Sequence, residues 1–296
     1  MWQEIKYSYR RGTMLVRLLY INGGVFLAVK IAEMIDVFLA RPLLAAAAIG
    51  YLAIPAELPS LATRFWTPVT YMFLHQGFIH LIFNLLWLYW FGRIFLQYLD
   101  QRKLVALYIM GGLSGALFFV AIYNIFPAFA DLVPHSLALG ASASVMAIVV
   151  GISAWVPNHE LHLLLAGRIR IKYIALFIFL ITSIIDFSDN TGGKIAHIGG
   201  AAIGLLYVRW LRTGFDAGSW INSIIDTLVN LFRPGKRLRV KHKSTRPPSD
   251  DYEYNRMKAE QQAEIDRILE KISKGGYESL TSEEKRKLFT ESQKNS

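Results

Sequence analysis

Residues 75–93 read HQGFIHLIFNLLWLYWFGR, a mostly apolar stretch whose polar side chains lie mainly in its first half. A bilayer crossing needs about 20 mostly apolar residues, so this stretch is long enough to span a membrane. His75 is near its start, and His80 and Asn84 follow one helical turn apart on the same face. Because polar side chains inside a span are costly, they mark function by default. The stretch therefore predicts a membrane helix with a functional polar face.

The rest of the chain places this helix in a polytopic membrane protein. Of its 296 residues, 53% are hydrophobic and 18% charged, whereas soluble domains carry about a quarter charged residues. We predict an all-α protein, a six-transmembrane-helix bundle with a short helical cytoplasmic tail. The expected spans are 14–37, 75–93, 104–126, 137–156, 171–187 and 193–211. This pattern excludes an ordinary cytosolic enzyme, a disordered chain and a small secreted scaffold.

Charge and cysteine content narrow the class further. With no cysteine, the chain has no disulfide, thiolate metal site or cysteine nucleophile. The net charge of +10 fits attachment to anionic lipid on the cytoplasmic side better than nucleic-acid binding. Lys and Arg favour cytoplasmic loops, so their distribution predicts cytoplasmic N and C termini. Ten basic residues then lie inside (Lys6, Arg10, Arg11, Arg17, Arg93, Arg102, Lys103, Arg168, Arg170 and Lys172), against three outside (Arg41, Arg64 and Lys194).

Four polar residues are expected at one depth. Under this topology the span 137–156 places Ser142, and the span 193–211 places His197, roughly 6–8 Å below the outer edge, at about 1.5 Å per residue. His80 lies at a similar depth and Asn84 one turn below. A serine, two histidines and an asparagine thus share one layer in the outer half of the bilayer.

This layer contains the groups of a serine hydrolase. A serine hydroxyl becomes a nucleophile when a base takes its proton, and histidine suits that role near neutral pH. Acyl transfer also needs hydrogen-bond donors for the oxyanion. His80, Asn84 and the backbone N–H of Ser142, near a helix N-terminus, offer such donors. No acid completes a triad, but a Ser–His dyad can act without one.

Small residues on the two spans predict a close approach of Ser142 and His197, near enough for a hydrogen bond. Small side chains allow membrane helices to pack tightly. The stripes are Gly140, Ser144, Ala147 and Gly151 on one span, and Ala196, Gly200 and Gly204 on the other. A dimer face is the alternative reading of the Gly-x-x-x-Gly pair.

These motifs resemble the rhomboid family of intramembrane serine proteases, over about residues 60–211 and the first span. The family pattern His-x-x-x-x-His-x-x-x-Asn is matched from His75 to Asn84. Its nucleophile pattern Gly-x-Ser-x is matched by residues 140–143, and its pattern Ala-His-x-x-Gly-x-x-x-Gly by residues 196–204. Three motifs in order, on the expected spans, make the resemblance specific.

The resemblance implies roles for individual residues. It makes Ser142 the nucleophile, His197 the general base and then acid, and His80 with Asn84 the oxyanion hole. Gly140, Gly200 and Gly204 support these motifs. It also implies cleavage of single-span membrane proteins in the outer half of the bilayer, without metal or cofactor. We expect the location to be a bacterial cytoplasmic membrane.

Two departures from the family pattern stand out. Glycine commonly follows the nucleophile, where this chain has Ala143, and the extra methyl is expected to tighten the oxyanion pocket. The outer loop often carries Trp-Arg, whereas here Phe65-Trp66-Thr67 follows a displaced Arg64. We expect this second change to affect the seating of the loop more than the chemistry. The same loop contains an apolar run, residues 43–56, that suits a re-entrant or interfacial segment.

Other polar residues have simpler interpretations. We interpret Ser114 and Ser144 as packing residues, and His75 as a buried hydrogen-bonding residue that helps hold the loop or the oxyanion side. His159 and His162 are assigned to a solvated loop rather than a metal site, because no third ligand is near. Asp186 and Asp189 are likewise assigned to a solvated loop rather than to a catalytic acid.

The tail follows the membrane domain. We divide the chain into a cytoplasmic N-terminus (1–13), the six-span domain (14–211), an amphipathic helix with a polybasic segment (212–246) and a small helical segment (247–296). The polybasic segment suits anionic lipid headgroups. In the last segment, an apolar stripe predicts a helix that ends at Gly275-Gly276, and residues 281–284 predict a capping box that opens another. The two helices are expected to dock on an unknown partner or a second copy.

Two other functions compete with this interpretation. The first is a catalytically inactive rhomboid-like protein that binds transmembrane helices; it would be expected to lack the serine or the histidine, and both are present. The second is a transporter or channel, which typically shows an internal repeat or a charged path through the membrane. The polar layer stays in the outer half, which disfavours that reading.

Overall fold

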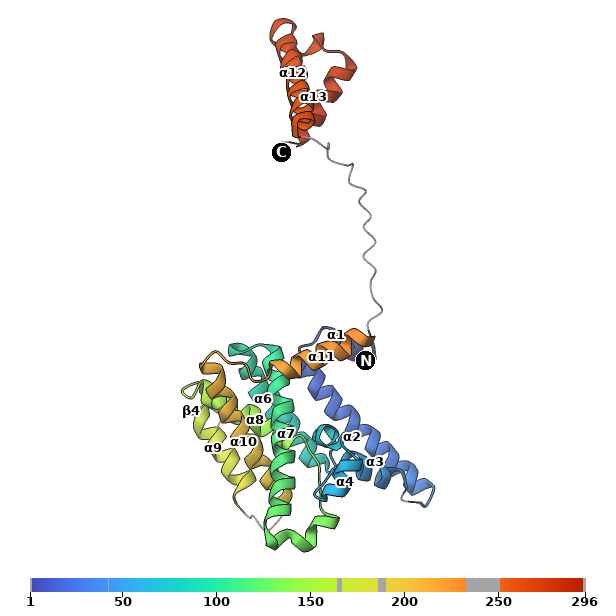
Figure 1. Ribbon diagram of the computed structural model, residues 1–296, viewed down its shortest axis with the longest axis vertical. Helices are drawn as coiled ribbons and strands as arrows, with labels where there is room; N and C mark the ends of the chain where they lie inside the picture. The colour runs from blue at the N-terminus through green and yellow to red at the C-terminus, as the bar shows by residue number, and fades with distance from the viewer. Residues whose placement is uncertain (1, 42, 164–166, 186–189, 233–250, 295–296) are drawn as a thin grey trace. The chain divides into compact units, whose positions relative to one another are not determined.

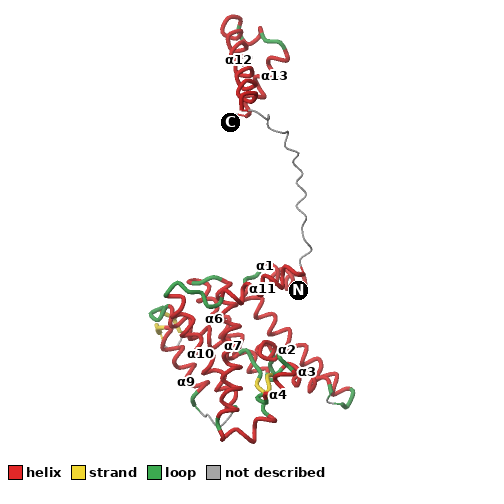
Figure 2. The backbone as a smooth tube through the Cα atoms, in the orientation of Figure 1, coloured by secondary structure: helices red, strands yellow, loops and turns green. Residues whose placement is uncertain are grey.

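The computed structural model describes residues 2–41, 43–163, 167–185, 190–232 and 251–294. The chain divides into two compact units, residues 1–233 and 234–296. Helices dominate both units, as Figures 1 and 2 show. Short strands occur only as two antiparallel pairs in the described part of the first unit.

The first unit contains a helix at each predicted span. These are α2 (Met14–Phe38), α6 (Phe78–Tyr98), α7 (Gln101–Ile125), α8 (Ser142–Trp155), α9 (Ile171–Ser183) and α10 (Thr191–Arg212). Among the described residues, α2, α6 and α7 are long and apolar enough to cross a membrane, and α8 and α9 are shorter apolar helices. The fold is therefore that of a mostly helical membrane protein, whereas the number of six crossings stays a prediction.

The centre of this unit is the packing of α7, α8 and α10 through glycines. A Cβ added at Gly200 of α10 would lie 2.2 Å from the Ala143 carbonyl oxygen of α8. One turn further along, a Cβ at Gly204 would lie 2.6 Å from the Ala147 carbonyl oxygen. The two helices are thus in backbone contact, as the small residues predict. Because its two glycines are buried against α8, the Gly-x-x-x-Gly pair is an internal contact and not a free dimer face.

The charged residues of α2 have partners. Lys30 and Glu33 form an ion pair of 2.7 Å one turn apart. Asp36 accepts the backbone N–H groups of Leu44 at 2.9 Å and Ala45 at 2.8 Å, in the first turn of α3 (Leu44–Leu52). Because the first N–H groups of a helix lack intrahelical partners, Asp36 caps α3 from another helix.

The chain between α2 and α6 closes around the other end of α3. Arg64, which ends α4 (Leu58–Thr63), donates to the Gly50 carbonyl. Trp66 donates to the Tyr51 carbonyl at 2.8 Å, just before α5 (Thr67–Thr70). Both residues therefore satisfy last-turn carbonyls of α3. The loop then continues through η1 (Tyr71–Phe73) to the start of α6.

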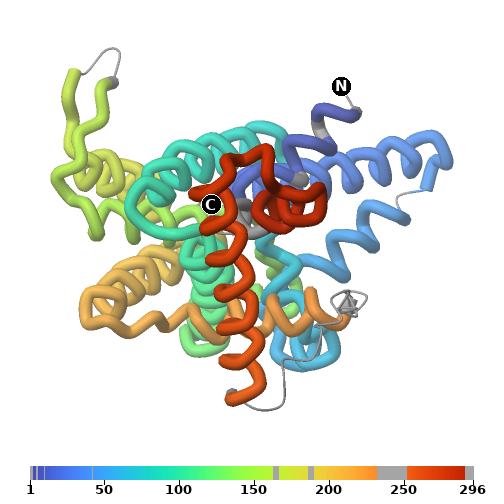
Figure 3. Tube along the Cα trace, turned by 90° about the horizontal axis from the view of Figure 1, so that it is seen from above, coloured from blue at the N-terminus to red at the C-terminus, as the bar shows by residue number. Residues whose placement is uncertain are grey.

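The strands join distant parts of the chain. β1 (Ile54–Pro55) pairs with β2 (Leu137–Ala138), which follows η2 (Pro127–His135) and precedes residues 140–143. β3 (Glu160–Leu163) and β4 (Gly167–Arg170) form an antiparallel hairpin between α8 and α9. The hairpin lies at the edge of the unit in Figure 3.

This hairpin replaces the loop expected at His159 and His162 with a strand from residue 160, whereas His162 is exposed, as expected. Leu161 is opposite Ile169 in the hairpin, and both are half-buried. Alternation of side chains along a strand lets that pair face the protein while its neighbours face outward. His159 lies just before β3, and its Nδ1 is 2.8 Å from the Tyr98 hydroxyl. Within the described ranges, no group of three acidic, histidine or cysteine side chains could hold a metal ion.

Two further helices, α1 (Trp2–Arg11) and α11 (Ser219–Phe232), lie at the same end of this unit in Figure 1. In α11, Ile221 is buried, whereas Trp220 and Ile224 are about half-exposed. An ion pair of 3.2 Å between Arg102 and Asp226 connects α11 to α7. The polybasic segment and the Pro-rich linker after α11 lie outside the described residues.

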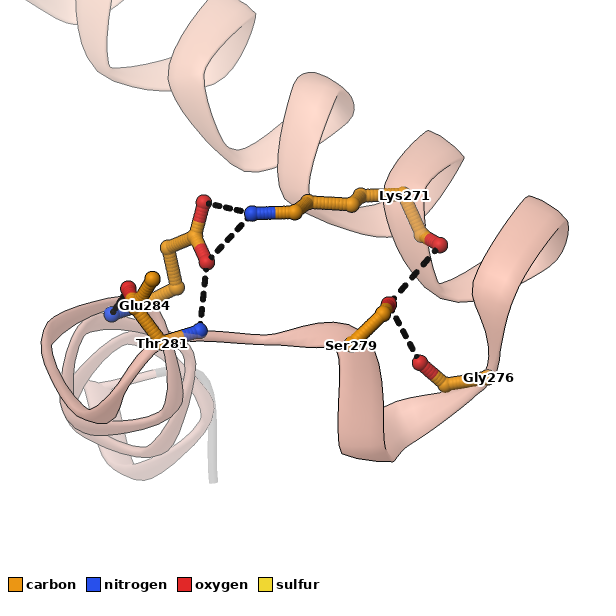
Figure 4. Close-up of polar contacts among 5 residues, drawn as sticks. All are labelled: Lys271, Gly276, Ser279, Thr281 and Glu284. Carbon is orange, nitrogen blue, oxygen red and sulfur yellow. Dashed lines mark hydrogen bonds and ion pairs between the residues drawn. The ribbon is translucent and has the colours of Figure 1, made fainter.

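The second unit contains α12 (Asp251–Gly275), η3 (Tyr277–Ser279) and α13 (Ser282–Lys294). Helix α12 ends at the glycine pair, where Gly276 has φ +72°, as predicted. The expected capping box is also present, since the Thr281 backbone N–H donates to Glu284 at 2.7 Å and the Thr281 hydroxyl accepts the Glu284 N–H at 3.4 Å. Lys271 of α12 pairs with Glu284 at 2.9 Å (Figure 4). These contacts join the two helices.

Candidate active site

The four predicted catalytic residues line one cavity of about 380 Å³. His80 and Asn84 come from α6, Ser142 from the first position of α8, and His197 from the second turn of α10. Thr182 of α9 adds a polar wall. The remaining lining is apolar and consists of Phe83, Trp87, Val145, Met146, Val149, Phe177, Ile178 and Ile181. The structure therefore brings together residues that lie 117 positions apart in the chain, from 80 to 197.

A backbone carbonyl orients His197. Its Nδ1 lies 3.0 Å from the Thr182 carbonyl oxygen, in the last turn of α9. Carbonyls in a last turn have no intrahelical donor, so this oxygen is free to accept. Because a carbonyl can only accept, Nδ1 carries the proton, and Nε2 is left as the basic nitrogen. The carbonyl thus does the orienting that an aspartate does in a triad.

Ser142 begins α8, which gives its surroundings unpaired backbone donors. The preceding residue, Ala141, has no side-chain cap, so the first N–H groups of α8 lack side-chain partners. The expected hydrogen bond between Ser142 and His197 is not formed within the described structure. Catalytic hydrogen bonds are commonly long in free enzymes and shorten in the substrate complex. The two residues share the cavity without yet being hydrogen-bonded.

Asn84 and His80 flank the serine. The Asn84 amide donates one N–H to the His80 carbonyl at 3.0 Å, which fixes the side chain and leaves its second N–H for another acceptor. A Cβ at Gly140 would lie 3.0 Å from His80 Cε1 and 3.7 Å from Ser142 Oγ. The φ of Gly140 is +128°, a conformation that L side chains rarely adopt. Glycine at 140 therefore serves both the turn and the space beside His80.

His75 holds the turn that precedes Ser142, the predicted nucleophile. It is fully buried, and its Nε2 accepts the Ala141 backbone N–H at 3.4 Å. Its Nδ1 then carries the proton and donates to the Phe73 carbonyl, also at 3.4 Å. The ring lies 5.4 Å from that of His80 in an edge-on arrangement. This agrees with the interpretation of His75 as a buried hydrogen-bonding residue.

The methyl group of Ala143 points away from the cavity. Ala143 is only 1% exposed and does not line the cavity. A Cβ added at Gly115 of α7 would lie 2.5 Å from the Ala143 Cβ. The missing side chain of Gly115 therefore provides the space that the Ala143 methyl occupies. The expected tightening of the oxyanion pocket by Ala143 is not seen.

The other polar candidates either pack between helices or lie outside the described residues. Ser114 donates to the Gly199 carbonyl at 2.8 Å, and Ser144 contacts the Met72 sulfur at 3.9 Å. Both join helices, as interpreted. Asp186 and Asp189 lie outside the described residues. Sequence reasoning missed the Thr182 carbonyl, because a main-chain acceptor has no residue-type signal beyond its place at a helix end.

Fold and cavity together define a helical membrane protein with an internal serine–histidine site. The chain belongs to the rhomboid family, because the family model described as Rhomboid domain matches residues 62–213, half of the chain. A second model, described as a family of unknown function (DUF6576), matches residues 249–294.

A relative supports the family. Presenilin-associated rhomboid-like protein A, mitochondrial, from Danio rerio, is 29% identical over 159 residues. That alignment covers 51% of this chain and 39% of the relative. The chain therefore matches well under half of that protein.

Proposed function

We propose that the protein is a serine endopeptidase that cleaves single-span membrane proteins in the outer half of the bilayer through a Ser–His dyad and an acyl-enzyme. The observation that carries this proposal is the single cavity shared by Ser142, His197, His80 and Asn84. The family adds support, since rhomboids are generally serine proteases. No metal or cofactor has a part in this chemistry.

The proposed reaction assigns one role to each residue. His197 Nε2 takes the proton of Ser142 as the hydroxyl attacks the peptide carbonyl, then protonates the leaving amine. The Thr182 carbonyl holds the imidazole through Nδ1 and stabilises its charged form. Asn84, His80 and the Ser142 backbone N–H donate to the oxyanion. Water then hydrolyses the acyl-enzyme with His197 acting again as base.

The setting of this reaction is also part of the proposal. Six crossings with cytoplasmic termini place the cavity in the outer leaflet. The half-exposed apolar side chains of α11 and the basic segment after it favour binding to the cytoplasmic surface and its anionic lipids. A bacterial cytoplasmic membrane stays a prediction, and the name of the relative from Danio rerio says that that protein is mitochondrial.

Cleavage of a single-span reporter in liposomes tests the dyad. Ser142→Ala and His197→Ala should each lower the rate at least about 10³-fold. Ser153→Ala is the matched control, because Ser153 lies on the same helix and its buried hydroxyl has no hydrogen-bond partner among the residues that the structure describes. The control should cut at the wild-type rate. Cleavage that survives Ser142→Ala would refute the nucleophile.

The same assay separates the alternative, an inactive rhomboid-like protein that binds transmembrane helices. Such a protein would retain the reporter in a pull-down from liposomes without cutting it. It would also fail to react with a fluorophosphonate, which labels activated serines. Labelling of wild type but not of Ser142→Ala or His197→Ala would support the protease.

A further inference from the structure

A short segment before α6 forms the support on which the nucleophile turn rests. The Tyr71 carbonyl accepts the Gly140 N–H at 2.9 Å. His75 accepts the Ala141 N–H, and the Met72 sulfur receives the Ser144 hydroxyl at 3.9 Å. Residues 71–75 therefore make three contacts with residues 140–144, which form the nucleophile turn and the start of α8. Any shift of this segment would shift the backbone that positions Ser142.

That segment is in turn held by a buried tyrosine of α7. The Tyr108 hydroxyl donates to the Met72 carbonyl at 3.0 Å, and the Tyr108 ring packs 5.7 Å from that of Phe73. Tyr108 is completely buried. The hydroxyl is the donor that satisfies the Met72 carbonyl, so its removal would leave a buried acceptor unpaired.

Asn22 of α2 completes the arrangement from outside the matched rhomboid region. Its amide nitrogen donates one N–H to the Leu18 carbonyl at 2.8 Å and the other to the Tyr108 hydroxyl at 3.1 Å. Asn22 is also completely buried. The Tyr108 hydroxyl also lies 3.3 Å from Asn22 Oδ1, but the Met72 carbonyl is nearer at 3.0 Å. Because the hydroxyl oxygen accepts from the Asn22 amide, it keeps its own proton to donate to Met72.

We propose that Tyr108 and Asn22 are positioning residues for the nucleophile turn, acting through the Met72 carbonyl and residues 71–75. The proposal rests on the proposed protease function for its kinetic consequences. It gives the first span, α2, a role in the active site although the rhomboid domain match begins only at residue 62.

Two substitutions test this in the full-length protein. Tyr108→Phe keeps the ring and removes the hydroxyl, and should lower kcat about tenfold with KM within about twofold, since substrate contacts are untouched. Asn22→Leu should have a smaller effect of the same kind. The double variant should be no slower than Tyr108→Phe alone, because Asn22 acts through the same hydroxyl.

Tyr123→Phe is the matched control on the same helix. Tyr123 is buried, 6% exposed, and its hydroxyl forms no hydrogen bond with the described residues. A purely structural role would lower the unfolding midpoint of Tyr108→Phe without changing kcat of the folded fraction. Equal kcat for Tyr108→Phe and Tyr123→Phe would overturn the proposal.

Hydrogen exchange gives a readout that does not depend on cleavage. The amides of Gly140 and Ala141 should exchange at least about tenfold faster in Tyr108→Phe than in Tyr123→Phe. Unchanged exchange of this turn would overturn the positioning role even if the wild type cuts. If the wild type cuts nothing and its serine does not react with fluorophosphonate, the protease proposal fails, while faster exchange would still support the positioning role.

Discussion

The contact between Gly200 and Ala143 predicts a large effect from one methyl group. In Gly200→Ala the new Cβ would lie 2.2 Å from the Ala143 carbonyl oxygen, whereas real Cβ atoms essentially never approach within 3.0 Å. Because the obstacle is backbone, α8 and α10 must separate by about 0.8 Å at this point. Such overpacking costs about 1–3 kcal/mol of stability.

The same displacement would reach the proposed catalytic pair. His197 lies one turn before Gly200 on α10, and Ser142 directly precedes Ala143 on α8. A misplacement of about 1 Å between reacting groups lowers rates about 10²-fold. We therefore expect Gly200→Ala to cleave a single-span reporter about 10²-fold more slowly than wild type, with a modest fall in the unfolding midpoint.

Two further glycine variants allow the size of the effect to be compared with the severity of the contact. Gly204→Ala creates a milder contact, 2.6 Å from the Ala147 carbonyl oxygen, and lies further from His197, so its loss should be smaller. Gly24→Ala in α2 meets no atom within 4 Å and is the control; alanine is also favoured over glycine in helices. Initial rates in liposomes, normalised to folded protein, should be lowest for Gly200→Ala, intermediate for Gly204→Ala and highest for Gly24→Ala. Folded Gly200→Ala with a rate within threefold of Gly24→Ala would refute the reasoning.

Two other predictions follow from local contacts. Gly115→Ala should destabilise the protein, because its Cβ would lie 2.5 Å from that of Ala143. Adding Ala143→Gly to the same chain should recover about 1 kcal/mol of the lost stability. If the changes in the free energy of unfolding of the two single variants simply add in the double variant, this prediction is wrong. In the tail, the Thr281 backbone N–H and then the Lys271 side chain lower the pKa of Glu284 from 4.5 to about 2. The carboxylate therefore stabilises the tail above pH 4.5, and this is lost as the pH falls toward 2. At pH 4.5, pepsin should cut residues 251–294 of the full chain faster in Glu284→Gln than in wild type. At about pH 2, it should cut both equally fast. Equal cutting at pH 4.5 would contradict the stabilising role of the Glu284 carboxylate.

The sequence predicted the helices well where apolar length decides the structure. Long apolar runs have few alternatives to a buried helix, so α2, α6 and α7 lie where expected. Glycine at 276 and the Thr281–Glu284 pair likewise predicted a helix end and a helix start from local chemistry alone. The loop at residues 160–163 was the error, because four residues of alternating polarity are too short to distinguish a strand from a loop.

In the candidate site, the side chains could be predicted from the sequence, but the main-chain contact that holds His197 could not. Residue type and spacing predicted that Ser142, His197, His80 and Asn84 act together, and these four residues line one cavity; their catalytic roles stay a prediction. Neither type nor spacing could identify the Thr182 carbonyl that holds His197, because every residue carries a carbonyl and only the end of α9 leaves this one unpaired.

By itself, the sequence determined that the chain is a helical membrane protein, and it identified the rhomboid motifs, because apolar length and reactive side chains are written residue by residue. Only the tertiary structure decided how these residues are held. The space that Gly115 leaves for Ala143 and the support of residues 71–75 beneath the nucleophile turn join positions far apart in the chain. Such contacts depend on how helices approach one another to within a few tenths of an ångström, which residue spacing along one helix does not specify.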